Sequence, residues 1–241
     1  MKCHAIDNGN GVWTVDVSGS LSRDDPKRLT EIVTAALAAF ARCMVLVGEK
    51  NMFNGGASRA SLLDGNGSQP NYPGALARAL LDIPIPTVAA MAGHAVGGGL
   101  MLGLLCEHVV LAEDRLYGAN FITLGITPGM GATVLLEEAF GPLLAREMLY
   151  TGCLLTGAEL RTRGARVPYI LPQDDVETHA MALARSLAAV SSTSTRLLRE
   201  TLASRRRTRI ERALVDERRM HEEVFRDPLT LVTISEQLAH D

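Results

Sequence analysis

Residues Met91–Asp114 read MAGHAVGGGLMLGLLCEHVVLAED and decide the fold. Three consecutive glycines, Gly97–Gly99, stand between an expected strand at 87–91 and an apolar helix expected over 99–106, and the buried strand HVVLAE follows. Glycine lets the backbone approach a ligand closely, and a helix N-terminus carries a partial positive charge. The stretch therefore indicates either a site for an oxyanion or a tight strand-to-helix turn without a ligand.

Strands and helices alternate around this stretch. Val12–Val17 is rich in β-branched residues, Leu29–Phe40 has apolar residues at helical spacing, and CMVLVGE is a short apolar run typical of a strand buried on both faces. From residue 176 onward the pattern is helical, in three segments: VETHAMALARSLAAV, STSTRLLRETLASR and IERALVDERRMHEEVF. We therefore expect an α/β fold with a core over residues 1–190 and a helical region over residues 191–241.

Composition excludes several classes of function. The 241 residues carry a net charge of −3, which gives no general footprint for nucleic acid. The four cysteines form no C-x-x-C pair, so we expect no metal site and a reducing environment. The opening MKCHAIDNG lacks the apolar core of a signal peptide, and no apolar run is long enough to span a bilayer. We expect a cytoplasmic protein without a membrane role.

Two further motifs could meet the glycine triplet. FNGGASRASLL, at Phe53–Leu63, is a glycine-rich turn before a short helix, and the amide of Ala57 could converge with that of Gly98. LYGANFITLGITPGMGATVLLEEAFG, at Leu116–Gly141, breaks at TPGMGAT before another helix. Each motif alone is weak, because glycine-rich loops are common.

Taken together and in this order, GHAVGGG, FNGGA and TPGMGAT resemble the crotonase (enoyl-CoA hydratase/isomerase) superfamily. The resemblance implies a ββα-spiral core, an acyl-thioester substrate, and a homotrimer or dimer of trimers in which residues 191–241 serve as a trimerisation and lid region. It also implies an oxyanion hole formed by the amides of Gly98 and Ala57, with Gly97 and Ser58 beside them at the substrate.

Two positions depart from the hydratases of this superfamily. Those enzymes carry one glutamate three residues after the oxyanion glycine and another before the TPG-type turn, where this chain has Met101 and Phe121. Hydration needs a base to activate water, and neither side chain can move a proton. The resemblance therefore implies that Met101 and Phe121 line the substrate site without acting as bases.

YGANFITLGITPGMGAT and the C-terminal MHEEVF are more similar to one subgroup, the second crotonase-like enzymes of polyketide β-branching cassettes. These enzymes decarboxylate a 3-methylglutaconyl group on an acyl carrier protein, and the oxyanion hole stabilises the resulting dienolate. No cofactor is implied, because the substrate is carried on phosphopantetheine or CoA. Some members use a Tyr and a Lys at positions that correspond to Ser61 and Gly65 here, which leaves the proton donor and the carboxylate anchor open. Ser61 is expected to contact the substrate.

His221, in the MHE segment, is the residue that this resemblance favours as the proton donor; a solvated helix histidine is the alternative. Asn120 could hydrogen-bond the substrate carboxylate or serve packing. Tyr72 and Tyr117 could reach the site, whereas His94 is expected to be structural.

The basic segment Ser204–Arg212, SRRRTRIER, is either a solvated helix face or a dock for an acidic carrier protein or the phosphates of CoA. Two other functions remain open. One is an enoyl-CoA hydratase or isomerase, against which the missing glutamates argue. The other is a catalytically silent crotonase-like protein, which the scarcity of acid and base residues would allow.

Overall fold

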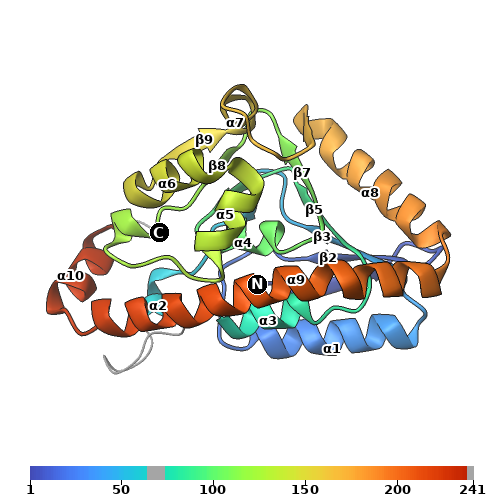
Figure 1. The fold of residues 1–241 in the computed structure, drawn as a ribbon, viewed down its shortest axis with the longest axis horizontal. Helices are drawn as coiled ribbons and strands as arrows, with labels where there is room; N and C mark the ends of the chain where they lie inside the picture. The colour runs from blue at the N-terminus through green and yellow to red at the C-terminus, as the bar shows by residue number, and fades with distance from the viewer. Residues whose placement is uncertain (64–73, 238–241) are drawn as a thin grey trace.

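A computed structural model describes residues 1–63 and 74–237 of the chain, and two sheets organise them (Figure 1). The larger sheet has the strand order β1 (His4–Asp7), β2 (Val12–Asp16), β3 (Cys43–Val47), β5 (Thr87–Met91), β7 (His108–Ala112) and β10 (Tyr169–Leu171). The smaller sheet has the order β4 (Met52–Asn54), β6 (His94–Val96), β8 (Leu116–Gly118) and β9 (Leu154–Thr156). From β2 to β10 the neighbours in the larger sheet are parallel, and β1 pairs antiparallel with β2.

The chain winds through the two sheets as a spiral of β-β-α units. In each turn one strand joins the larger sheet, the next joins the smaller sheet, and a helical segment leads back. The three turns run β3–β4–α2–α3, β5–β6–α4 and β7–β8–η1–α5. Their helical segments are α2 (Arg59–Leu63), α3 (Gly74–Leu81), α4 (Gly98–Leu104), the 3₁₀ turn η1 (Ile122–Leu124) and α5 (Ala132–Phe140). This arrangement confirms the predicted ββα-spiral α/β fold.

The remaining helices enclose the spiral: α1 (Asp25–Ala38), α6 (Pro142–Thr151), α7 (Gly157–Thr162), α8 (Gln173–Ala189), α9 (Ser192–Val224) and α10 (Pro228–Gln237). Helix α8 covers one face of the larger sheet, where Cys43 and Val45 of β3 point toward it. Met44 and Leu46 point to the opposite face and join the main core. Alternation along a strand thus places apolar side chains in two layers, as expected for a strand buried on both faces.

Some boundaries differ from the sequence prediction. Phe40 lies beyond the end of α1, with a φ of 61° and 85% of its surface exposed, so its apolar character is not used in the core. The two C-terminal segments predicted on either side of the basic stretch form one 33-residue helix, α9. No glycine or proline interrupts residues 192–224, so nothing in the backbone ends the helix there.

Helix α9 runs across the width of the molecule (Figure 1) and packs against α3 and α5, while α10 packs against α2 and η1. The helical region after residue 190 therefore lies on the spiral core of the same chain. Among the helices of the described residues, none has both the length and the apolar composition needed to cross a bilayer.

Candidate active site

A cavity of about 800 Å³ opens where the glycine triplet meets the FNGG turn. Its lining comes from segments far apart in sequence, and it includes eight of the residues singled out from the sequence: Ala57, Ser58, Ser61, Gly97, Gly98, Asn120, Phe121 and His221. A cavity of this size accommodates a small acyl group with its carrier arm. The spiral therefore brings most of the predicted site together.

The three glycines of the triplet occupy positions with different geometry. Gly97 has a φ of 55°, a backbone conformation that side-chain-bearing residues rarely adopt, and it forms the N-cap of α4. Gly98 is the first helical residue and faces the cavity. A Cβ atom on Gly99 would lie 1.9 Å from the carbonyl oxygen of Asn54, so the close contact between α4 and the FNGG turn requires glycine there.

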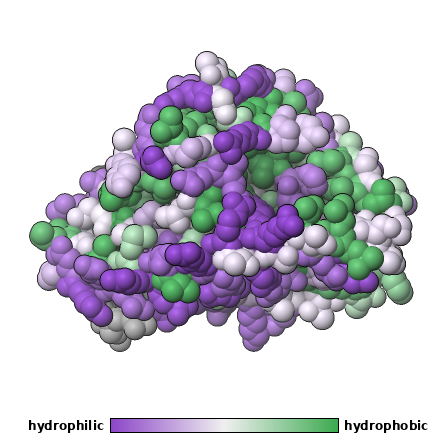
Figure 2. All heavy atoms as spheres, in the orientation of Figure 1, coloured by the Kyte–Doolittle hydropathy of each residue, from purple (hydrophilic) through white to green (hydrophobic). Residues whose placement is uncertain are grey.

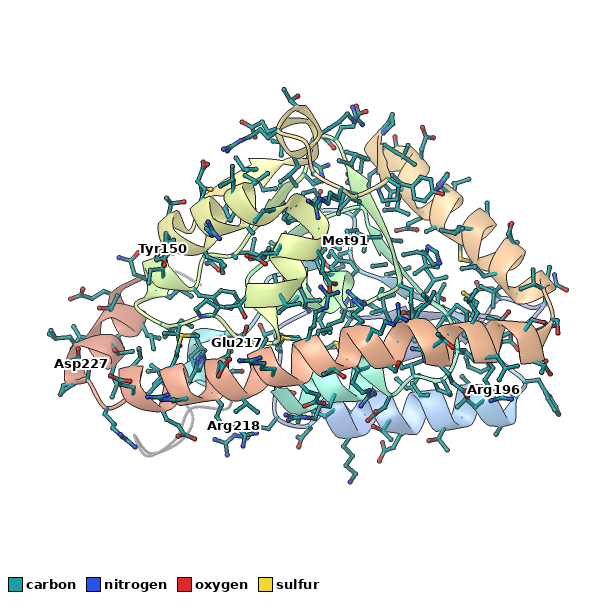
Figure 3. All side chains as sticks on the ribbon, viewed as in Figure 1. Met91, Tyr150, Arg196, Glu217, Arg218 and Asp227 are labelled. Carbon is teal, nitrogen blue, oxygen red and sulfur yellow. The ribbon has the colours of Figure 1, made fainter. Side chains whose placement is uncertain are left out.

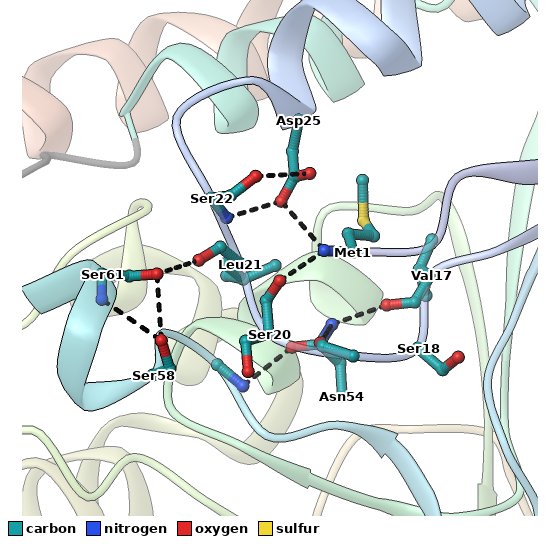
Figure 4. A network of polar contacts seen from close by, with 12 residues as sticks. Met1, Val17, Ser18, Ser20, Leu21, Ser22, Asp25, Asn54, Ser58 and Ser61 are labelled. Atoms are coloured by element: carbon teal, nitrogen blue, oxygen red, sulfur yellow. Dashed lines mark hydrogen bonds and ion pairs between the residues drawn. The ribbon is translucent and has the colours of Figure 1, made fainter.

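The FNGG turn is held by a buried asparagine (Figure 4). Nδ2 of Asn54 donates to the carbonyl oxygens of Val17, at 2.6 Å, and Gly19, at 2.8 Å. Its Oδ1 accepts a 2.8 Å hydrogen bond from the amide of Gly56. The buried side-chain amide of Asn54 uses both its nitrogen and its oxygen in hydrogen bonds. These bonds hold the turn in place, because breaking any of them would leave a buried polar group without a partner. Asn54 was not predicted from the sequence, since one asparagine in a polar turn gives no distinctive signal.

The two turns converge on one point. A Cβ atom on Gly56 would lie 3.2 Å from the amide nitrogen of Gly98. On its other side, the turn forms a β-bridge between Leu21 and Ala57, and Leu21 donates to the Gly56 carbonyl at 2.9 Å. Among the hydrogen bonds of the described loops and turns, the amides of Ala57 and Gly98 donate none. The Gly98 amide and the Gly56–Ala57 turn therefore lie side by side at the wall of the cavity.

Ser58 and Ser61 form a small polar network beside the FNGG turn (Figure 4). Their hydroxyl oxygens are 3.1 Å apart, and Oγ of Ser61 donates to the Leu21 carbonyl at 2.8 Å. The hydroxyl of Ser61 is therefore tied to the protein backbone. Gly65 and Tyr72 lie outside the described residues.

His221 enters the cavity from α9. Its side chain is 6% exposed, and its Nδ1 lies 2.7 Å from Oγ1 of Thr127 in the TPGMG turn. Phe225, one turn later, packs against the ring with 5.7 Å between centroids. Burial lowers the pKa of His221 to about 4, and a hydrogen bond to the backbone of Glu217 acts in the opposite direction. The imidazole of His221 is therefore neutral at pH 7.

We expect His221 to make the protein less stable in acid. The folded protein resists protonating this ring until about pH 4, whereas the unfolded chain takes up the proton near pH 6.5. The contribution to the free energy of unfolding is therefore full above pH 6.5 and falls by up to ~3 kcal/mol toward pH 4. Urea unfolding at pH 7.5, 5.5 and 4.5 should show a smaller fall for His221→Gln than for the wild type. Equal falls would contradict the buried neutral histidine.

Glu217, one turn before His221, is a fully buried carboxylate that the sequence prediction missed (Figure 3). It accepts hydrogen bonds from the amide of Gly131 at 2.7 Å, and from the amide and hydroxyl of Thr133 at 3.1 and 2.9 Å. These groups begin α5, where a carboxylate satisfies the unpaired amides and matches the helix dipole. Glu217 thus links α9 to the TPGMG turn that carries Thr127.

Other predicted residues are divided between cavity and core. Asn120 and Phe121 line the cavity, whereas Met101 is fully buried and is not among the described residues that line it. Every residue of α4 is buried, and the Met101 side chain packs in the core, so the contact of Met101 with substrate stays a prediction. Tyr117 is also in the core, where its hydroxyl donates to the Met91 carbonyl at 2.7 Å. Nδ1 of His94 accepts from a backbone amide, in agreement with a structural role.

The basic segment makes contacts within its own chain. Arg206 and Arg209 both pair with Glu138, and Arg207 pairs with Asp82. The side chain of Arg206 is 23% exposed and that of Arg209 is 61% exposed. Three guanidinium groups of the predicted docking surface therefore already bind acidic side chains of the same chain.

The described residues that line the cavity include no aspartate and no glutamate. The lining is mainly backbone at glycine, small side chains and apolar groups, with His221 as its one histidine among those residues. A carboxylate base for activating water is therefore missing from the described walls.

The spiral fold, the glycine-rich helix start and the FNGG turn define an enzyme of the crotonase superfamily. The chain belongs to the enoyl-CoA hydratase/isomerase family, whose model matches residues 29–229.

Three known proteins are similar over most of the chain. The bacillaene synthase decarboxylase PksI of Bacillus subtilis is 36% identical over 186 residues, covering 76% of this chain and 74% of PksI. The ECH2 decarboxylase domain of CurF from Lyngbya majuscula is 28% identical, with a TM-score of 0.85 and coverage of 97% and 98%. A structure from a dehydratase/decarboxylase enzyme couple involved in polyketide β-branching is 29% identical, with a TM-score of 0.88 and coverage of 98% of both chains.

Proposed function

We propose that this protein is a polyketide β-branching decarboxylase that acts on a 3-methylglutaconyl-type thioester of an acyl carrier protein. The observation that carries the proposal is the convergence of the Gly98 amide and the Gly56–Ala57 turn at a cavity whose described walls hold no carboxylate. Such a site can stabilise a negative thioester oxygen but has no evident base for adding water. The similarity to PksI and to the CurF decarboxylase domain agrees with this chemistry.

In the proposed reaction, the bond between the γ-carbon and the terminal carboxylate breaks and CO2 leaves. The electron pair moves through the unsaturated system onto the thioester oxygen, which the amides of Ala57 and Gly98 stabilise. A proton then adds to carbon and gives the unsaturated thioester product. Atoms and charge balance with one proton supplied and one CO2 released.

His221 is the proposed source of that proton. Burial keeps its imidazole neutral at pH 7, but an entering substrate carboxylate would raise the pKa of the ring, because an opposite charge favours the protonated form. The imidazolium would then stand beside the dienolate once CO2 has left. Thr127, which contacts Nδ1, would fix the ring orientation during the transfer.

The acyl group would arrive on the phosphopantetheine arm of the carrier protein, with CoA as the alternative carrier, and no further cofactor is needed. Asn120 and the network of Ser58 and Ser61 supply polar groups near the FNGG turn for the substrate. We assign the carrier arm to the same cavity, because the thioester carbonyl must reach the two amides.

The decisive test offers the enzyme two substrates: a 3-methylglutaconyl carrier protein and an enoyl carrier protein without the second carboxylate. We expect CO2 release from the first and no water addition to the second, measured by mass spectrometry of the intact carrier proteins. Water addition without CO2 release would establish the hydratase alternative. No turnover of either substrate, nor of their CoA analogues, would favour a silent crotonase-like protein.

We further propose a homotrimer or a dimer of trimers. Hydrophobic side chains gather at the start of α9, where Leu197, Leu198 and Leu202 are each more than half exposed (Figure 2). An apolar patch of this kind favours contact with another copy of the chain. Light scattering at micromolar concentration should give a mass three or six times that of the chain. A monodisperse monomer would contradict the proposal.

A further inference from the structure

Arg206 connects α9 to the helix that carries the Gly98 amide. Its Nη1 donates to the carbonyl oxygens of Leu105, at 2.9 Å, and Cys106, at 3.3 Å, and its Nη2 donates to the carbonyl of Leu104. The carbonyls of Leu104 and Leu105 belong to the last residue and the C-cap of α4, where carbonyls lack partners within the helix, and Cys106 follows directly. One guanidinium group therefore donates hydrogen bonds to the carbonyl oxygens at the C-terminal end of α4.

The same arginine is fixed from its other side. Nε of Arg206 lies 2.9 Å from Oε2 of Glu138 on α5, and both side chains are about one-fifth exposed. The Glu138 carboxylate also pairs with Arg209, which makes no contact with α4 in the described hydrogen bonds. Because α5 is held at its beginning by Glu217, the guanidinium of Arg206 belongs to a rigid frame formed by α5 and α9.

Helix α4 is short enough for its two ends to act as one body. Its seven residues span about 10 Å, with the Gly98 amide at the cavity and the Arg206 guanidinium at the opposite end. The peptide dipoles point their positive end toward the cavity, and a cation at the negative end stabilises that arrangement. A shift of α4 along its axis would move the Gly98 amide relative to Ala57, which sits on a separate turn.

We propose that Arg206 is a positioning residue for the oxyanion hole, holding α4 so that the Gly98 amide stays aligned with that of Ala57. The inference rests on the proposed function, since it assumes that these amides bind a thioester oxygen. This role for Arg206 differs from both interpretations of the basic segment SRRRTRIER, which were a docking surface for an acidic carrier protein or CoA and a solvated helix face.

The test compares Arg206→Gln, Arg206→Lys and the matched control Arg209→Gln, which removes the other cation on Glu138 and leaves the α4 carbonyls capped. We expect kcat for CO2 release to fall roughly 3- to 10-fold in Arg206→Gln, with KM within about twofold. Arg206→Lys should recover part of the loss, and Arg209→Gln should stay within about twofold of the wild type. If Arg206→Gln does not fold, Arg206→Lys against Arg209→Gln gives the same comparison.

A spectroscopic readout separates alignment from stability. The carbonyl stretch of a ¹³C-labelled 3-methylcrotonyl pantetheine thioester, measured by isotope-edited infrared spectroscopy, should shift to lower frequency when bound to the wild type. In Arg206→Gln the shift should be smaller, and in Arg209→Gln it should be unchanged. An equal shift in wild type and Arg206→Gln would overturn the positioning role, whereas no shift in the wild type would overturn the oxyanion hole itself.

Discussion

Replacing Gly98 with proline should lower the rate of CO2 release about 10²–10³-fold while the protein remains folded. Proline removes the amide hydrogen that the proposed oxyanion hole requires. Gly98 is the first residue of α4, a position where proline is well tolerated because that amide has no partner within the helix. The substitution should therefore lower the reaction rate without destabilising the helix.

The matched control is Gly98→Ala, which keeps the amide and adds a Cβ atom at the same place. That atom would meet Cδ1 of Leu21 at 2.8 Å and Sδ of Met130 at 3.2 Å, both ends of flexible side chains. We expect Gly98→Ala to lose much less activity than Gly98→Pro, with both variants checked by circular dichroism. Near-normal turnover in a folded Gly98→Pro protein, or equal losses in both, would contradict the assignment of Gly98.

Restoring the glutamate of the hydratases, as Met101→Glu, should destabilise the protein and should not raise its native activity. Met101 is fully buried in the core, where an unpaired carboxylate costs about 3–5 kcal/mol at a pH that ionises it. Burial would raise the pKa of the new carboxyl, so the loss should be small in acid and grow as the pH rises above about 4.3. CO2 release should slow, because α4 also carries Gly98.

Met101→Gln is the appropriate comparison, since it has nearly the same shape without the charge. Unfolding by urea at pH 4 and pH 8 should separate Met101→Glu from Met101→Gln only at the higher pH. Activity is then measured at a temperature at which all proteins are folded. Faster CO2 release in Met101→Glu, or a wild type that adds water and releases no CO2, would contradict the decarboxylase proposal.

The sequence alone predicted the buried strands of the larger sheet and the position of the cavity. Short apolar runs predicted β3, β5 and β7, because a strand buried on both faces needs apolar residues at every position. The spacing of Thr156 and Glu159 is the sequence pattern of a capping box, and the structure contains both of its hydrogen bonds at the start of α7. The glycine triplet marked the cavity, since close backbone contact excludes side chains whatever the rest of the fold does.

The tertiary structure alone decided which distant groups meet. The three-residue strands of the smaller sheet were missed, because segments such as His94–Val96 are too short to show a period and are strands only through their neighbours. The roles of Asn54, Glu217 and Arg206 likewise depend on partners between 35 and more than 100 residues away in the chain. Local patterns report which face of an element is apolar, but a buried polar group is defined by the atoms that satisfy it, and chain folding alone brings those atoms within hydrogen-bonding distance.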